Sequence, residues 1–369
     1  MTKALVRKTS TEQGLLTFLQ DLLKNKVVSG VFSLKVINKD GDIAYALITN
    51  PDDLKDARPF YPLMPENAGL HLSRFTLKGT AKQPVLAVVK PCELRGFVEL
   101  IKREQGNLDK LITISATCGG VFPIKMAVSK DHEKHLSKYW ESVKKGEIHP
   151  EIRSVCKACE NFEPYTADIT VDLLGNSKSD AQLCMYFNTN KGKELATALK
   201  TTLVEKDSDK KTLDAIRKKR TAEKQRLFAD IQKQLNGIDG LVNIFGRCIG
   251  CHGCSKVCPI CYCRLCEFES PEAEYNPAHF ESEFKKKGAM KVPPGTLYYQ
   301  LGRLSHIGIS CVACGQCEDV CPVDIPVAMI FKYVGESIQT MFEYVPGKNR
   351  DEKIPLITFN KEEFAEIEE

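Results

Sequence analysis

The sequence has little tryptophan, no long apolar run and no glycine-rich dinucleotide fingerprint. One of its 369 residues is Trp, and 8% are aromatic. No stretch approaches the roughly 18 consecutive apolar residues of a membrane-spanning helix, so we expect no membrane span. The chain opens with MTKALVRKTSTEQG, which lacks the apolar core of a secretory signal, so we expect a cytoplasmic protein. Because no GxGxxG motif is present, a Rossmann-type NAD site has no sequence support.

The sequence also lacks a strong excess of charge of either sign. Lys and Arg number 52 and Asp and Glu number 48, which gives a net charge of +4. This small excess does not indicate a nucleic-acid partner. Apolar residues make up 43% of the chain, which is enough for hydrophobic cores, and the length predicts two or three domains.

Cysteine, in contrast, is abundant, with 16 residues. Two runs, at 248–259 and 311–322, share the spacing Cys-x2-Cys-x2-Cys-x3-Cys-Pro. This is the run with which bacterial ferredoxins bind [4Fe–4S] clusters, and in two-cluster proteins the fourth Cys of each run binds the other cluster. Zinc sites, the alternative, more often use paired CxxC units. We therefore assign one cluster to Cys248, Cys251, Cys254 and Cys321, and the other to Cys311, Cys314, Cys317 and Cys258.

The cluster spacings and the missing signal argue against a secreted disulfide scaffold. Eight cysteines lie outside the two runs. One of them, Cys184, lies in an apolar segment and is predicted to be a core residue, which leaves seven. Three of them, Cys261, Cys263 and Cys266, are surplus to two clusters. They are either alternative ligands or three ligands of a further centre without an evident fourth.

The other four cysteines can form a third set, consisting of Cys92, Cys118, Cys156 and Cys159. The first two follow predicted strands at 84–90 and 111–117. A helical pattern at 93–106 lies between these strands, which indicates a parallel βαβ unit whose ligands gather at the carboxyl ends of the strands. The last two form a CxxC, which by itself is open to zinc, a redox dithiol or half a cluster.

The rest of the N-terminal half also alternates helix and strand patterns. The leucines of 11–25 form one helical stripe, and Asp40-Gly41 is the predicted turn of a hairpin. Further strands are predicted at 27–37, 43–49, 167–174 and 181–187. We predict an α+β fold that begins with a mixed α/β domain.

The C-terminal half is predicted to be helical. Residues 205–235 are charge-dense and are interpreted as a solvated linker helix with a basic run from Arg217 to Arg220. About fifty residues separate the two cysteine runs, and helical patterns occur at 271–288, 296–308 and 326–342. This favours a helical two-cluster ferredoxin domain over the small βαβ kind. The predicted divisions are 1–204, a linker at 205–240, the ferredoxin domain at 241–347 and a tail at 348–369.

Several segments together resemble a known family. They are QGLLTFLQDLLKNKVVSGV, VVKPCELRGFVELIKREQGNLDKL, ATCGG, CKACENFEPYTADI, CIGCHGCSKVCPICYCRLC and HIGISCVACGQCEDVCPVDIP. They resemble the beta subunits of coenzyme F420-reducing hydrogenases and F420-dependent formate dehydrogenases, most of all the formate dehydrogenase branch, over nearly the whole chain. The resemblance implies that the set at Cys92, Cys118, Cys156 and Cys159 holds a [4Fe–4S] cluster beside FAD.

The resemblance also implies flavin contacts. Gly14 and Thr17 match the start of the family's first helix, although Gln13-Gly14 stands where the family has a Gly-Gly pair. A glycine-containing segment after the Ala-Asp dipeptide is kept as Leu174-Gly175-Asn176. Polar neighbours expected for FAD or its anionic substrate are Asn67, Lys90 and Arg95, and the alternative is that these are ordinary surface or loop residues.

The implied function is exchange of a hydride between coenzyme F420 and FAD, followed by single-electron transfer through three [4Fe–4S] clusters to a partner. The partner is expected to be formate dehydrogenase-, formylmethanofuran dehydrogenase-, hydrogenase- or heterodisulfide reductase-like, and the resemblance leaves this choice open. Alternatives are an electron-transfer-only subunit and a flavin oxidoreductase that uses NAD(P)H. A docking surface is expected near the second run, with Asp319 and Asp324 setting its orientation.

Overall fold

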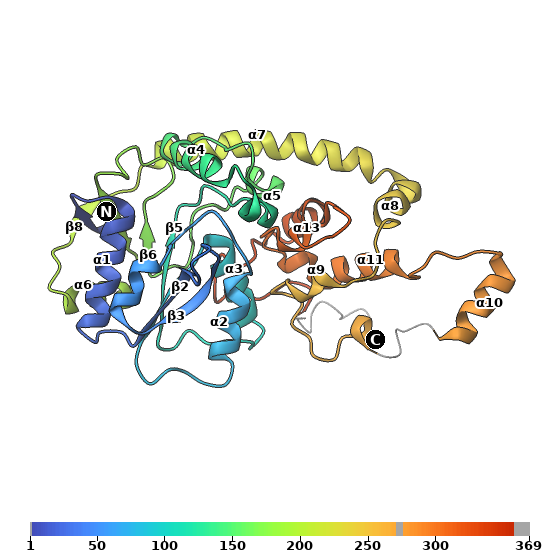
Figure 1. Ribbon diagram of the computed structural model, residues 1–369, viewed down its shortest axis with the longest axis horizontal. Coiled ribbons are helices and arrows are strands. Elements are labelled where there is room, and N and C mark those ends of the chain that lie inside the picture. Colours follow the sequence, from blue (N-terminus) through green and yellow to red (C-terminus); the bar gives the residue numbers. More distant parts are fainter. Residues whose placement is uncertain (1, 271–275, 358–369) are drawn as a thin grey trace, which may run out of the picture.

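The computed structural model describes residues 2–270 and 276–357 (Figure 1). An α/β domain is followed by a long helix, which runs along one side of the molecule to a helical part (Figure 1). The predicted α+β fold class is therefore confirmed. No helix among the described residues is both long and apolar enough to cross a membrane.

Eight strands within the described residues form one sheet, in the order β3-β2-β4-β5-β6-β7-β1-β8. The strands β2, β4, β5 and β6 are parallel, whereas β3 and β7 pair antiparallel at either side of this block, and β1 and β8 complete the sheet antiparallel beyond β7. Their bounds are β1 Thr2–Arg7, β2 Gly30–Val36, β3 Ile43–Ile48, β4 Val85–Val88, β5 Leu111–Ala116, β6 Ile169–Val171, β7 Leu183–Phe187 and β8 Val204–Lys206.

Helices cover both faces of the sheet. Leu86 and Val88 of β4 share one core with α1, whereas Ala87 shares a second core with α2 and α3, as expected from the two-residue period of a strand. The helices of this domain are α1 Thr11–Lys24, α2 Ala68–Thr76, α3 Pro91–Ile101, α4 His132–Lys145, α5 Ser154–Lys157 and α6 Asn190–Ala198, with short 3-10 turns at Pro51–Asp56 and Ile124–Val128. The predicted βαβ unit is confirmed as β4-α3-β5.

The long helix α7, Lys210–Gln234, is not the solvated linker that its charge density predicted. Leu213, Ile216, Arg220 and Ile231 are buried along its length. Its N-terminal half packs on the α/β domain beside α5, and its C-terminal half packs on α8 and α13 of the helical part (Figure 1). The helix therefore belongs to the cores of both parts.

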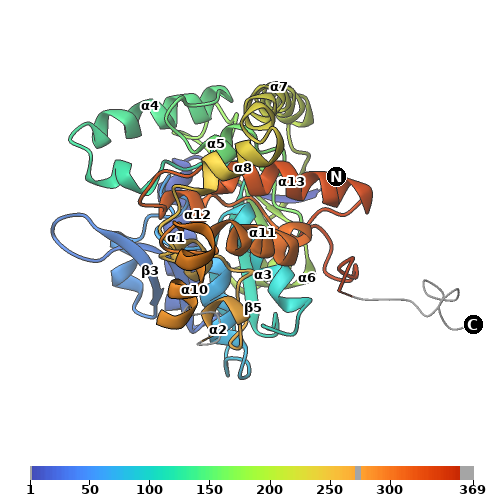
Figure 2. The ribbon, with the colours of Figure 1, turned by 90° about the vertical axis from the view of Figure 1, so that its right-hand side faces the viewer.

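The helical part encloses a separate hydrophobic core that includes cysteines of both runs. Its helices are α8 Gly237–Phe245, α9 Gly253–Lys256, α10 Pro277–Lys287, α11 Thr296–Ile307, α12 Gln316–Asp319 and α13 Val327–Met341, with 3-10 turns at Glu267–Glu269 and Gly308–Ser310. The helical prediction for 271–288 falls partly on 271–275, outside the described residues. The helix α10 has no buried residue and projects from the body in Figure 1, so that in Figure 2 it lies in front of the body.

After α13 the chain returns to the α/β domain rather than forming a separate tail. The backbone N–H of Gly347 donates to Glu99 Oε1 at 2.8 Å, and Arg95 Nε donates to the carbonyl of Pro346 at 2.7 Å. Further along, Arg350 donates to the carbonyl of Thr166 at 2.6 Å. The predicted tail at 348–369 is thus bound to the domain at its start, and 358–369 lies outside the described residues.

Candidate functional site

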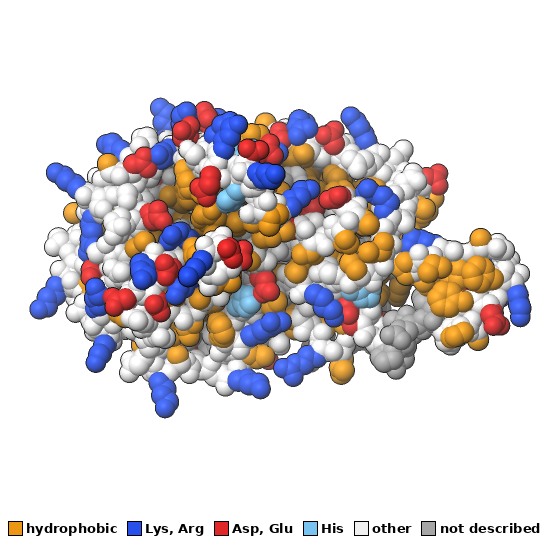
Figure 3. Space-filling model, viewed as in Figure 1, with side chains coloured by type: hydrophobic (Ala, Val, Ile, Leu, Met, Phe, Trp, Pro, Cys, Tyr) orange, Lys and Arg blue, Asp and Glu red, His pale blue; other side chains and the backbone are white. Residues whose placement is uncertain are grey.

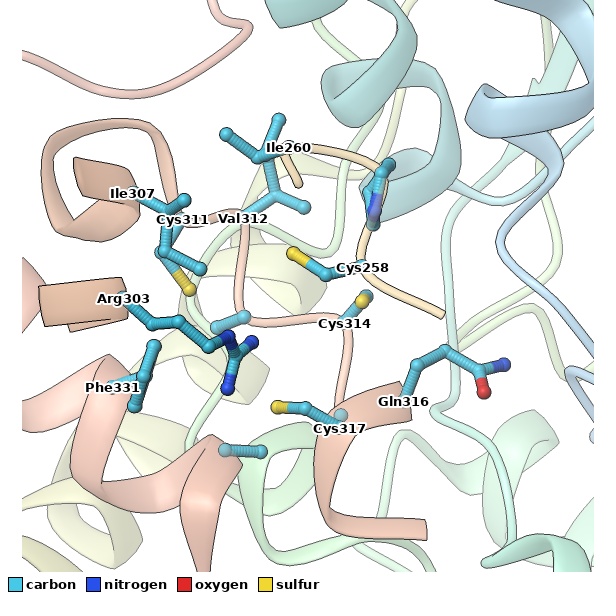
Figure 4. A pocket seen from close by; sticks show the side chains of 14 residues that line it. Cys258, Ile260, Arg303, Ile307, Cys311, Val312, Cys314, Gln316, Cys317 and Phe331 are labelled. Atoms are coloured by element: carbon cyan, nitrogen blue, oxygen red, sulfur yellow. The ribbon is translucent and has the colours of Figure 1, made fainter. Parts of the chain in front are cut away.

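The first set of cysteines, here called the inner set, combines members of both runs: Cys258, Cys311, Cys314 and Cys317. Their side chains face a common cavity of about 410 Å³ (Figure 4). Positive φ angles at Ala313 and Gly315 curl the backbone so that successive thiols turn toward the same space. Apolar residues such as Ile307 and Phe331 form much of its wall, and Arg303 and Gln316 also line it.

The second set, the outer set, is Cys248, Cys251, Cys254 and Cys321, around a cavity of about 320 Å³. Positive φ angles at Gly250 and His252 repeat the backbone curl of the inner set. Cys248 and Cys254 are buried, whereas Cys251 is exposed. Each run therefore sends its fourth cysteine to the cavity of the other, which is the geometry expected for a two-cluster ferredoxin.

The four thiols of neither set point at one common position where a single metal ion could bind. Within the part of the chain that the structure describes, no three His, Cys, Asp or Glu side chains lie close enough together to hold one metal ion. A [4Fe–4S] cluster binds one cysteine at each of four iron atoms, so its ligands stand apart around a space. Soft thiolates around a mainly apolar space fit such a cluster better than mononuclear zinc.

The third set, the N-terminal set, brings together Cys92 in the first turn of α3, Cys118 after β5, Cys156 in α5, and Cys159. Burial raises the pKa of the Cys156 thiol to about 12, and nearby Cys118 and Cys159 add to the increase against the opposing Arg153. Burial likewise raises the pKa values of Cys92 and Cys118. Such thiols ionise only when a cation compensates them, and bound iron would do so.

A glycine loop makes room for this set. The backbone N–H of Gly120 donates to Cys118 Sγ at 3.3 Å. At φ +104°, Gly120 has a conformation that side chains rarely adopt, and an added Cβ would lie 3.1 Å from that of Cys156. The structure therefore explains why Gly120 follows Cys118 in the sequence Cys118-Gly119-Gly120 after β5: a larger residue would crowd Cys156.

The three sets follow one another through the molecule. Cys92 of the N-terminal set is close enough to Cys314 of the inner set to interact electrostatically. The adjoining Arg303 contacts Cys254 of the outer set and also lines the inner cavity. The order is therefore N-terminal set, inner set, outer set, ending at the exposed Cys251.

Arg220 is a site residue that the sequence interpretation missed. It is 1% exposed, and its guanidinium donates to the backbone carbonyls of Cys118 at 2.9 Å and Cys159 at 3.2 Å. It also lies over the ring of Phe162, at 4.8 Å from the centroid. Helical spacing is the sequence feature that could have identified it, because Leu213, Ile216 and Arg220 lie on the same face of α7.

The predicted flavin contacts are not brought together. Gly14 is packed, since an added Cβ would lie 2.7 Å from Thr9 Cγ2 and 2.8 Å from Leu183 Cδ2, and Thr17 Oγ1 donates within its own helix to the carbonyl of Gln13. Contact of these two residues with a flavin stays a prediction. Gly175 and Asn176 instead line a polar cavity of about 700 Å³.

The other three predicted contacts lie near the cysteine sets. Asn67 caps α2 by accepting from the N–H of Gly69 at 2.9 Å, and its side chain also lies beside Cys314. Lys90 is buried at the start of α3. Arg95 lines a groove of about 420 Å³ between the two parts of the molecule, which also reaches Cys159 and Cys311.

The expectation that Asp319 orients a docking partner is wrong. Its carboxylate is 4% exposed and forms an ion pair with Arg153, 2.5 Å between Oδ2 and the guanidinium. Arg153 also donates to the carbonyl of Cys314 at 2.7 Å. The pair therefore joins the α/β domain to the inner set. Asp324 is 84% exposed, beside a similarly exposed Lys125.

The surplus cysteines differ in position. Cys261 is partly buried beside Cys258, and a hydrogen bond from the Cys258 thiol is the main cause of its lowered pKa. Cys263 is exposed and Cys266 is partly exposed. The two interpretations offered for them, alternative ligands or a further centre, stay predictions.

Three sets of four cysteines predict about twelve iron and about twelve sulfide per chain after anaerobic preparation. Colorimetric iron and sulfide analysis, scaled to amino-acid analysis, measures this directly. A value near eight would exclude a cluster at the N-terminal set. A value near sixteen would indicate a further centre that uses Cys261, Cys263 and Cys266.

Comparisons with known proteins agree with this geometry. Residues 82–212 match the family model for the C terminus of the coenzyme F420 hydrogenase/dehydrogenase beta subunit, and residues 244–325 match that for a 4Fe-4S dicluster domain. The chain is 30% identical to the F420-dependent formate dehydrogenase 1 subunit beta of Methanococcus maripaludis over 371 residues, which cover 91% of this chain and 90% of that protein.

The chain is also similar to two further proteins. The F420-dependent formate dehydrogenase subunit beta of Methanocaldococcus jannaschii is 29% identical over 358 residues, covering 88% of this chain and 89% of that protein. A chain of the F420-reducing [NiFe] hydrogenase complex from Methanosarcina barkeri, solved as a xenon derivative, shows 18% identity at a TM-score of 0.44, covering 65% of this chain and 94% of that one.

Proposed function

Because the chain belongs to the beta-subunit family of coenzyme F420 hydrogenases and dehydrogenases, we propose that it exchanges electrons between F420 and a partner within a larger oxidoreductase complex. FAD, when bound, would exchange a hydride with F420 and pass single electrons to iron–sulfur clusters. The observation that carries the proposal is the continuous order of the three cysteine sets, from the α/β domain to the exposed Cys251.

The chain's contribution is to hold twelve thiols in place and to keep water away from most of them. Hydrogen bonds and burial around thiolates set the potential of a bound cluster. Gly120 N–H beside Cys118, Asn67 beside Cys314 and Gln300 Nε2, 3.8 Å from Cys248 Sγ, are the polar groups placed for this. The apolar walls of the inner cavity supply the burial.

We propose the groove at Arg95 as the position of the flavin and F420. Its volume of about 420 Å³ lies within the range for ligand pockets. Arg95 and Lys332 lie in its lining together with Glu160, Glu336 and Glu343, and Cys159 places the N-terminal set at its edge. The cavity at Gly175 and Asn176 is the second candidate, supported by the family match of these residues.

For electron exit, we propose a docking surface around the outer set rather than the second run. Cys251 is exposed there, and Ile249, Val292 and Tyr298 are exposed apolar residues at its rim, 50%, 69% and 66% accessible. In Figure 3, hydrophobic side chains gather over the helical part, and those at its right-hand end belong to the projecting α10. The partner would be a catalytic metalloenzyme subunit of the formate dehydrogenase, formylmethanofuran dehydrogenase or hydrogenase kind, or a heterodisulfide reductase-like carrier.

The test is the purified chain, prepared anaerobically, with viologen as artificial acceptor. We expect bound FAD and viologen reduction by F420H2, with none by NADH, formate or hydrogen. A preparation that binds all its iron but no flavin would favour the electron-transfer-only alternative. Activity with NADH or NADPH in place of F420H2 would favour the third interpretation.

A further inference from the structure

Arg303, on α11, is a buried cation between the inner and outer sets. Its side chain is 3% exposed. One guanidinium nitrogen donates to Cys254 Sγ at 3.1 Å, and the other donates to the carbonyl of Cys254 at 3.1 Å. The same side chain lines the inner cavity, where Figure 4 shows its guanidinium directed toward the space that the thiols of Cys258, Cys311 and Cys317 face.

No carboxylate of the described residues neutralises this cation. None of the ion pairs formed within 2–270 and 276–357 includes Arg303, although a buried guanidinium without a countercharge is strongly unfavourable. Its remaining contacts are neutral: the Gln300 side-chain oxygen at 3.3 Å and the ring of Phe331 at 5.0 Å. Cysteine sulfurs are therefore the anionic groups within its reach. Those that interact with it are Cys254 of the outer set, Cys261, which belongs to neither set, and Cys258 and Cys317 of the inner set.

We propose that Arg303 supplies a positive charge shared by the two clusters of the helical part, which makes both easier to reduce. The inference rests on the proposed binding of [4Fe–4S] clusters by these two sets. Each cluster gains one electron on reduction, and no atom is transferred. Because the added charge is negative, a buried cation nearby stabilises the reduced form, and it does so strongly where water is excluded.

The test is a redox titration with dithionite and mediators, followed by electron paramagnetic resonance, on three variants. Arg303→Gln removes the charge, Arg303→Lys keeps it, and Arg247→Gln removes one charge from an exposed side chain next to Cys248. We expect both cluster potentials of the helical part to become more negative in Arg303→Gln. They should change little in Arg303→Lys and in Arg247→Gln.

Iron analysis separates this inference from the proposed function. Wild-type protein without iron in these sets would end the proposed function itself. With full iron, unchanged potentials in Arg303→Gln, or an equal shift in Arg247→Gln, would overturn the role of Arg303 alone. Loss of iron from Arg303→Gln but not from Arg303→Lys would support the shared charge, whereas loss from both would show that the shape of arginine matters instead.

Discussion

In a folded Cys156→Ser protein, we expect electron transfer from F420H2 to the partner to fall to background and iron content to fall by about four atoms per chain. Cys156 lies in α5 at the centre of the N-terminal set, beside Cys118 and Cys159. Of the three sets, this one alone lies in the α/β domain, so its loss interrupts the path before the inner set. Flavin should remain reducible by F420H2, because that step precedes the interruption.

The matched control is Cys184→Ser. This cysteine is buried in β7 and belongs to none of the three sets. Its replacement should leave iron content and electron transfer unchanged. The readouts are iron analysis, flavin bleaching under F420H2, and partner reduction. Wild-type partner reduction in folded Cys156→Ser would mean that the CxxC is a spectator or a zinc site.

Asp319→Ala is expected to lower the free energy of unfolding by about 3–5 kcal/mol, because it leaves the buried Arg153 guanidinium without its partner. The carboxylate also accepts from the backbone N–H of Ile124 at 2.9 Å, so a second buried hydrogen bond is lost. The pair connects the α/β domain to the backbone of Cys314. Anaerobic urea unfolding followed by circular dichroism measures the change.

Asp324→Ala provides the comparison, since it removes the same charge from an exposed pair with Lys125. Exposed ion pairs contribute little, so stability should hardly change. Similar losses in both variants would contradict the distinction drawn between these aspartates. A defect in partner reduction confined to Asp324→Ala would restore the docking surface first expected near the second run.

The features that the sequence predicted well are local ones. Ligand spacing, helical period and the alternation of strands and helices are all properties of short segments, so the two ferredoxin-type runs and the β4-α3-β5 unit were recognisable. Even the exchange of Cys258 and Cys321 follows from a rule about spacing. Each such pattern can be recognised without knowing which other segments pack against it.

The features that the sequence predicted poorly depend on contacts between distant segments. Arg220 is one of many charged residues on α7, and only packing against Cys118 and Cys159 distinguishes it from its solvated neighbours. Asp319 is of a residue type that is usually exposed, but it pairs with Arg153, which lies 166 positions away in the sequence. Gly14, predicted as a flavin contact, packs against Leu183 from a distant segment, and its contact with a flavin stays a prediction.

The exchange of the fourth cysteines between the two runs also determines when, during synthesis, each cysteine set becomes complete. During synthesis, the N-terminal set has all its thiols once residue 159 has emerged, and domains generally fold as units from the N-terminus. A nascent chain that ends between the two runs carries three thiols of the outer set and one of the inner. Neither can be completed before Cys321 and Cys311 to Cys317 appear. Iron–sulfur insertion into the helical part must therefore wait for nearly the whole chain, and the two centres mature together.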